Sequence, residues 1–212
     1  MQTSELTPDA ALTRLKEGNQ RYVSGTGGRA DSSRTRREET AAHGQRPFAA
    51  VLGCSDSRVP LEILLDQGVG DIFTVRVAGN VCNQDEIASI EYALAHLGVP
   101  LCVVMGHTQC GAVTAVAGGA NLEGGLFNLT YNIRHALEKV KYASPGLSGA
   151  PLIEATIKEN IWRSIEDLFS DSIVARQNVK QGALSVVGAC YDIASGAVEW
   201  LGEHPAQNDL LG

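Results

Sequence analysis

Two short segments of the sequence contain side chains that bind metal ions, and each directly follows an apolar run. The segment CSDSR at 54–58 follows the run at 47–53, and the segment HTQCG at 107–111 follows the run at 100–106. Both runs are short and end in glycine, which is typical of buried parallel strands. In open α/β sheets the ligand site lies just beyond the carboxyl ends of the strands. We therefore expect the two segments to converge on one site.

Cys54, His107 and Cys110 in these segments form a ligand set that suits Zn²⁺. Zinc binds thiolate sulfur and imidazole nitrogen in tetrahedral geometry, and a catalytic site has three protein ligands and one open position. A structural zinc site usually shows two close pairs of ligands, whereas here only His107 and Cys110 are close in sequence. Each residue alone would more often be a core cysteine or a hydrogen-bonded loop histidine. The three together at strand ends favour one catalytic zinc ion per chain.

Asp56 and Arg58 lie next to the first of these ligands. Asp56 could bind the metal itself, or it could accept a hydrogen bond from water on the metal. Arg58 can hold the carboxylate in a bidentate, charge-assisted pair, which would draw Asp56 away from the metal and leave a position for water. The alternative interpretation is a solvated ion pair at a strand end, worth about 0–1 kcal/mol.

The segments CSDSRVP at 54–60 and GHTQCG at 106–111 resemble the two signature motifs of β-carbonic anhydrases. The resemblance covers most of the chain and includes the segment at 11–25, Arg76 and the segment SIEYA at 89–93. It implies the reversible hydration of carbon dioxide to bicarbonate and a proton at a zinc site. Because two thiolates make zinc a weaker Lewis acid than three imidazoles do, we expect activity to rise with pH.

The resemblance also implies a role for each matching residue. It implies zinc ligands at Cys54, His107 and Cys110, a catalytic pair at Asp56 and Arg58, and substrate-binding residues at Gln45, Phe73, Tyr92 and Gly111. In the family, the glutamine donates a hydrogen bond to substrate, and the two aromatic positions line an apolar pocket across a subunit interface. An N-terminal helical arm wraps a partner, so a homodimer or a dimer of dimers is expected.

Apolar runs alternate with helical patterns along the chain, which predicts one α/β domain over 1–212 with a mainly parallel central sheet flanked by helices. Residues 1–46 are expected to form a helical arm and connection, and residues 47–212 the zinc-binding core. The arm helix should begin at Thr7 and Pro8 and end near Gly25. Strands are expected at 47–53, 72–77 and 100–106, helices at 84–96, 126–142 and 152–169, and a C-terminal edge hairpin from 182–187 and 198–201.

Composition excludes several classes of protein. The 212 residues have a formal net charge of -7, which disfavours nucleic acid as a partner because phosphate contacts need a basic face. No apolar run is long enough to span a bilayer, so no membrane partner is expected. The N-terminus lacks the pattern of a signal peptide, which predicts a cytoplasmic protein. An odd number of dispersed cysteines favours reduced or metal-bound thiols over a disulfide framework.

Two other functions remain open at this point. Some relatives of this fold hydrolyse carbon disulfide or carbonyl sulfide at a similar zinc site, and an assay of sulfide release would distinguish them. A non-catalytic bicarbonate-sensing zinc module would lack Asp56 or Arg58, or would have a fourth protein ligand. Val51 stands where some β-carbonic anhydrases have a tryptophan of a non-catalytic bicarbonate pocket, so inhibition through that pocket is not expected. A zinc alcohol dehydrogenase is excluded because no G-x-G-x-x-G follows a strand.

Overall fold

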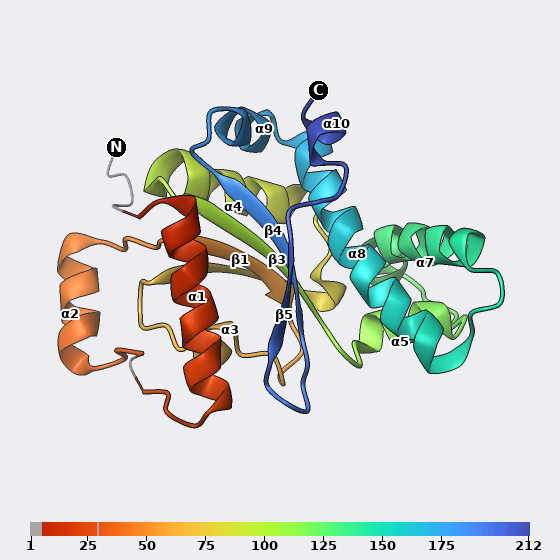
Figure 1. Ribbon diagram of the computed structural model, residues 1–212, viewed down its shortest axis with the longest axis horizontal. Helices are drawn as coiled ribbons and strands as arrows, with labels where there is room; N and C mark the ends of the chain where they lie inside the picture. Colours follow the sequence, from red (N-terminus) through yellow and green to blue (C-terminus); the bar gives the residue numbers. More distant parts are fainter. Residues whose placement is uncertain (1–5, 29) are drawn as a thin grey trace.

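The computed structural model describes residues 6–28 and 30–212 (Figure 1). Within these residues, five strands form one sheet in the order β2-β1-β3-β4-β5. All neighbouring strands are parallel except β4 and β5, which form an antiparallel hairpin at one edge. The predicted mainly parallel α/β sheet with an edge hairpin is thus confirmed. The strands are β1 (Ala49–Cys54), β2 (Ile72–Val77), β3 (Leu101–His107), β4 (Ser185–Tyr191) and β5 (Val198–Gly202).

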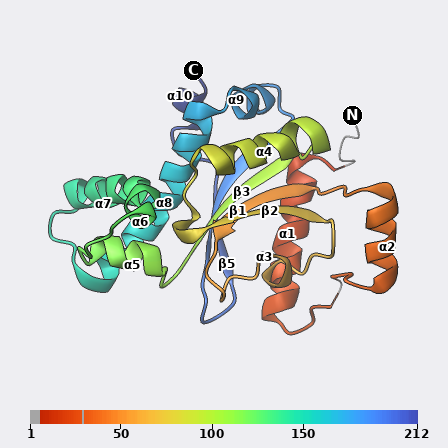
Figure 2. The same ribbon diagram turned by 180° about the vertical axis from the view of Figure 1, so that it is seen from behind.

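Helices cover both faces of the sheet (Figure 1, Figure 2). One face carries α1 (Pro8–Val23) and α3 (Leu61–Leu64), and the other carries α4 (Gln84–Leu97) and α8 (Gly149–Asp171). No helix among the described residues is both long and apolar enough to cross a membrane. The other helical elements are α2 (Arg34–His43), the 3₁₀ turn η1 (Ala78–Asn80), α5 (Gly111–Ala117), α6 (Gly125–Leu129), α7 (Tyr131–Ala143), α9 (Ile173–Lys180) and α10 (Gln207–Leu211).

Side chains alternate across the sheet and form two apolar layers. In β1, Ala50 and Leu52 pack with the layer under α4 and α8, whereas Val51 packs with the layer under α1 and α3. Every residue of β1 and β3 is buried, as expected for parallel strands that are covered on both faces. The two strands that end at the candidate site are therefore held by packing from both sides.

The N-terminal helix begins where the sequence predicts. The Thr7 side chain accepts a hydrogen bond from the Ala10 N–H at 3.3 Å, and Pro8 is the first helical residue. Ala11 and Leu15 are fully buried against this chain's own sheet. Helix α1 therefore belongs to the fold of its own protomer, and its contact with a partner stays a prediction. Residues 1–5 of the predicted arm lie outside the described residues.

Several predicted elements differ in extent from the structure by one to four residues, and two of these differences have a local cause. The helix predicted at 126–142 is divided at Thr130 into α6 and α7. The Thr130 hydroxyl and its backbone N–H both donate to the Leu126 carbonyl, at 2.7 and 3.0 Å, an arrangement that bends helices. The strand predicted at 182–187 begins later, at Ser185, because Gly182 adopts a left-handed turn with φ of 69°. It then extends to Tyr191, alongside His107.

Candidate metal centre

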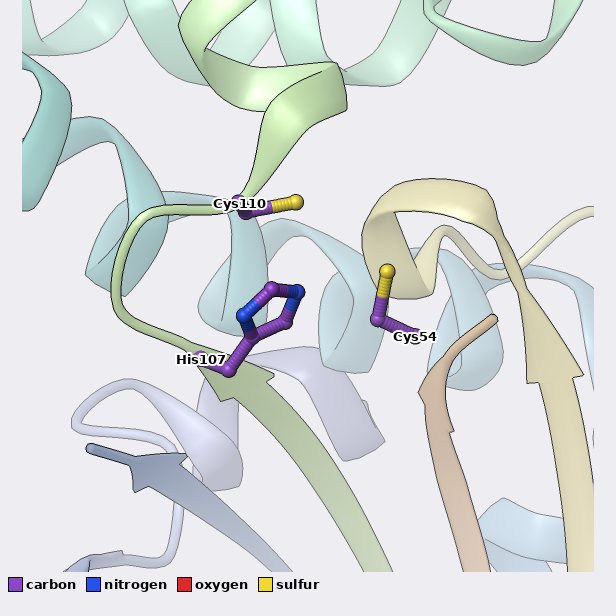
Figure 3. Close-up of side chains that lie close together, drawn as sticks. All are labelled: Cys54, His107 and Cys110. Carbon is purple, nitrogen blue, oxygen red and sulfur yellow. The ribbon is translucent and has the colours of Figure 1, made fainter. Parts of the chain in front are cut away.

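Cys54, His107 and Cys110 lie together at the carboxyl ends of β1 and β3 (Figure 3). Cys54 is the last residue of β1, His107 is the last residue of β3, and Cys110 directly precedes α5. The two sulfur atoms and one imidazole nitrogen are all within 4.8 Å of one another, and all three side chains are buried. The neighbouring parallel strands pair with Gly53 opposite Met105, which aligns their ends. The expected convergence of the three side chains is therefore present.

His107 offers one free nitrogen to this cluster. Its Nδ1 atom lies 2.9 Å from the Thr108 carbonyl oxygen, which assigns the proton to Nδ1 and leaves a lone pair on Nε2. Among the described residues, the buried Nε2 atom has no hydrogen-bond partner. A buried nitrogen left in this way is costly, and a metal ion would satisfy it. The donor set of two sulfurs and one imidazole nitrogen thus fits Zn²⁺.

The two thiols lie against each other and differ in acidity. Their mutual hydrogen bond lowers the pKa of Cys54 and raises the pKa of Cys110. The backbone N–H groups of Gly79 and Asp56 donate to Cys54 Sγ at 3.2 and 3.4 Å and favour its thiolate. A divalent cation between the sulfurs would favour the thiolate at both positions.

Arg58 holds Asp56 beside the cluster in a bidentate pair. Its Nε atom donates to Oδ1 at 2.9 Å and its Nη2 atom to Oδ2 at 2.7 Å. The Arg58 backbone N–H donates to Oδ1 as well, at 2.9 Å. These hydrogen bonds from Arg58 hold the pKa of the Asp56 carboxyl well below its usual range. Asp56 Oδ2 lies 4.0 Å from His107 Nε2, so a carboxylate oxygen faces the cluster while Arg58 restrains the group.

Two further residues border the cluster. Arg76 of β2 donates from Nε to the Cys54 carbonyl at 3.0 Å and from Nη2 to the Asp56 carbonyl at 2.8 Å, which braces the loop after β1. Gly111 is exposed at the first position of α5, and a Cβ atom there would meet nothing within 4 Å. Gly111 therefore lies at the surface, next to the buried Cys110.

Comparisons with known proteins identify the family. A model of the carbonic anhydrase family matches residues 49–198. A carbonic anhydrase of Mycolicibacterium smegmatis is 39% identical over 197 residues, which cover 91% of this chain and 92% of that protein. The β-carbonic anhydrase CafA of the fungal pathogen Aspergillus fumigatus is 30% identical, with a TM-score of 0.75 over 96% of each chain. The chain belongs to the β-carbonic anhydrase family.

The solved structures of β-carbonic anhydrases also include two tetrameric enzymes from Sordaria macrospora. This chain is similar to one of them with a TM-score of 0.73 and 25% identity, over 80% of this chain and 87% of that one. The enzyme class predicted from the two motifs, carbonic anhydrase, is confirmed.

Three residues expected to bind substrate in a β-carbonic anhydrase lie away from this chain's own cluster. Gln45 precedes β1 and Cys54 ends it, and a strand of this length spans about 17 Å at roughly 3.3 Å per residue. Phe73 pairs with Ala50, near the start of β1. The Phe73 and Tyr92 rings are 6.0 Å apart, and Tyr92 is 48% exposed. Gln45, Phe73 and Tyr92 thus lie around the edge strand β2 rather than at the cluster.

One contact of the cluster was not foreseen from the sequence. Gly79, 25 positions after Cys54, donates its N–H to the Cys54 sulfur. The segment AGN at 78–80 has the composition of a tight turn, and this was the available signal. No local pattern, however, indicates that the turn points its amide at a residue of another strand.

Proposed function

We propose that this β-carbonic anhydrase hydrates carbon dioxide reversibly with one Zn²⁺ held by Cys54, His107 and Cys110. The observation that carries the proposal is the Arg58–Asp56 pair beside the three buried donor atoms. Three protein ligands with a restrained carboxylate next to them leave one position open for substrate chemistry, which is the pattern of catalytic zinc sites.

In this proposal the protein positions the reactants, and Zn²⁺, when bound, supplies hydroxide near neutral pH by lowering the pKa of water. Asp56 stays ionised because Arg58 donates to both of its oxygens. It therefore acts as a hydrogen-bond acceptor that orients the nucleophile towards the carbon atom of carbon dioxide. Arg58 also restrains the carboxylate, which would otherwise compete for the open position.

Gln45, Phe73 and Tyr92 reach the site from a partner subunit in this proposal. The exposed apolar side chains Ile63 and Val69 lie near β2, on α3 and in the loop before the strand, and a dimer along this edge would cover them. The amide of Gln45 would donate to the substrate oxygen that becomes negative. Phe73 and Tyr92 would form an apolar wall for carbon dioxide, and Gly111, exposed at the start of α5, would complete the pocket.

The tetrameric relatives from Sordaria macrospora support a dimer of dimers as the assembly. We assign the whole chain, 1–212, to one domain, in which α1 and α2 supply the arm. The cytoplasmic location and the absence of nucleic-acid and membrane partners stay predictions from the sequence.

The test is stopped-flow carbon dioxide hydration at pH 7 and pH 8.5, with zinc content measured on the same samples. The wild type should contain about one zinc per chain and hydrate carbon dioxide rapidly, with a higher rate at pH 8.5. Cys54→Ala should lose both zinc and activity. Cys102→Ala is the matched control, because Cys102 is a buried cysteine inside β3 that does not belong to the cluster.

Two outcomes would contradict the proposal. Full zinc retention by Cys54→Ala would exclude this ligand set. A zinc-loaded wild type without hydration at either pH would exclude the reaction, and sulfide release from carbon disulfide or carbonyl sulfide would then identify the hydrolase alternative. The absence of both activities would favour the sensing module.

A further inference from the structure

The turn that approaches Cys54 has an unusual backbone. It is η1, between β2 and α4, where Gly79 and Asn80 both adopt left-handed conformations with φ of 75° and 43°. Glycine and asparagine are the residues that most readily adopt this conformation, so the local sequence permits the turn. The consequence of this conformation is that the Gly79 N–H donates to Cys54 Sγ at 3.2 Å.

Two side chains of α8 hold this turn. Asn160 donates from Nδ2 to the Gly79 carbonyl at 2.8 Å. The single proton of the Ser164 hydroxyl is shared between the Asn80 carbonyl and the Asn160 carbonyl, each 2.9 Å from Oγ. Both side chains are fully buried. Their spacing of four residues places them on one face of the helix. The carbonyls of Gly79 and Asn80 are thus bound by two side chains that lie one helical turn apart on α8.

Other elements pack closely around the turn. A Cβ atom on Gly79 would lie 2.7 Å from Ile133 Cδ1 of α7 and 3.2 Å from Ala112 Cβ, and the φ of 75° adds strain for most other residues. Helix α8 is itself seated closely on β3, because a Cβ on Gly106 would lie 2.8 Å from Ile161 Cγ1. Asn160 and Ser164 therefore lie on a helix that is in direct contact with the end of β3.

We propose that Asn160 and Ser164 are positioning residues of the metal centre, which aim the Gly79 N–H at the Cys54 sulfur and thereby tune this sulfur as a metal ligand. An N–H donor on a thiolate withdraws electron density and compensates its charge in a buried site. The inference rests on the proposed function, because it takes Cys54 as a zinc ligand. It adds two residues that lie outside the cluster of Cys54, His107 and Cys110 and more than a hundred positions after Cys54.

The test measures zinc release from the loaded, folded protein to a competing chelator. Asn160→Leu keeps the approximate volume but removes the donor, and should release zinc about tenfold faster than the wild type. With Co²⁺ in place of zinc, its sulfur-to-cobalt charge-transfer band should move to longer wavelength, because the sulfur loses a hydrogen bond. Ser164→Ala should change both readouts in the same direction, and decides the question if Asn160→Leu does not fold.

Thr156→Val is the matched control on the same helix. Thr156 is fully buried one turn before Asn160, and its hydroxyl donates to the Leu152 carbonyl of α8 itself at 2.7 Å. This variant should release zinc at the wild-type rate and keep the wild-type cobalt band.

Unchanged zinc release and an unchanged cobalt band in a folded Asn160→Leu or Ser164→Ala protein would overturn the inference. Equal acceleration in Asn160→Leu and Thr156→Val would overturn it too, because it would indicate general loosening of α8. A wild type that takes up no zinc would overturn the proposed function and this inference with it, so the two failures are distinguishable.

Discussion

At the scale of single residues, the candidate metal centre depends on the orientation of a few charged side chains. The Arg58 side chain is 49% exposed, and an exposed ion pair contributes only about 0–1 kcal/mol to stability. Its effect on the fold is therefore small, and its two-point contact with Asp56 matters chiefly for orienting the carboxylate. The zinc-binding candidates and this pair could be predicted from the sequence because each segment directly follows a buried strand.

Arg58→Lys should separate orientation from charge. Lysine keeps the positive charge but cannot form the bidentate contact, so Asp56 should be misplaced and kcat/KM should fall by about 10²-fold, with zinc content unchanged. Stopped-flow hydration and metal analysis measure both quantities. Arg34→Lys, which alters an exposed pair with Glu38 on α2, should retain the wild-type rate. A wild-type rate in Arg58→Lys would refute the role given to the pair.

At the scale of elements, the position of α8 on the sheet is set by glycines that allow close approach. A Cβ on Gly188 of β4 would lie 2.9 Å from Trp162 Cζ3. Gly188→Ala should therefore lower the free energy of unfolding by about 1–3 kcal/mol, measured by urea denaturation. At Gly146 a Cβ would meet nothing within 4 Å, so Gly146→Ala should unfold like the wild type. Equal stability of the two variants would argue against this packing.

Asp66 ties the segment between α1 and α2 to the end of α3. Its Oδ1 atom accepts from the N–H groups of Gly28 and Ala30 at 3.0 and 3.3 Å, and its Oδ2 atom accepts from Arg21 Nε at 2.6 Å. Burial alone would raise the pKa of Asp66, but these donors outweigh it and lower the pKa below its ordinary value. A carboxyl group whose pKa is lower in the folded state than in the unfolded state stabilises the fold at pH values above its unfolded-state pKa. This stabilisation is lost as the pH falls through the folded-state pKa.

Asp66→Asn should thus cost about 1–3 kcal/mol of unfolding free energy at pH 7, and the difference from wild type should shrink below about pH 4. Urea unfolding of both proteins at pH 7 and pH 3 measures this difference in unfolding free energy. Asp209→Asn, at an exposed position of α10, should unfold like the wild type at both pH values. If the difference in unfolding free energy between Asp66→Asn and the wild type were the same at pH 7 and pH 3, the proposed link between the Asp66 pKa and stability would be contradicted.

Most elements at this scale were predictable because apolar periodicity is a local property of the sequence. The division of α6 from α7 was missed because the helical spacing of Leu126, Leu129 and Ile133 continues across Thr130. The link from Asn160 to the Gly79 turn was missed because it joins segments 81 positions apart, and no local pattern specifies such a contact.

At the scale of the whole molecule, the residues expected to bind substrate do not all gather in one protomer. Cys54 ends β1, whereas Gln45 precedes it and Phe73 pairs near its start. The sequence could assign these residues to the site only through the family resemblance, since their chain positions carry no information about which subunit's site they reach. An active centre shared between protomers follows from the proposed dimer.

Ile63→Glu tests that assembly at a residue outside the proposed catalytic machinery. Ile63 on α3 is 62% exposed, and a charge there should weaken association and make specific activity fall on dilution. Sedimentation and hydration measured over a concentration series would detect both effects. Ile173→Glu is the matched control, because Ile173 on α9 is 61% exposed and lies outside the proposed interface. Unchanged association in Ile63→Glu would exclude an interface at this position.

The most direct test of the central claim is the removal and return of zinc in one preparation of the wild type. Hydration should disappear when a chelator has removed the metal, and about one equivalent of Zn²⁺ per chain should restore it. Mg²⁺ should not restore it, because Mg²⁺ prefers oxygen ligands to the sulfur and imidazole donors of this cluster. Hydration that continues at the initial rate after complete removal of zinc would contradict the account.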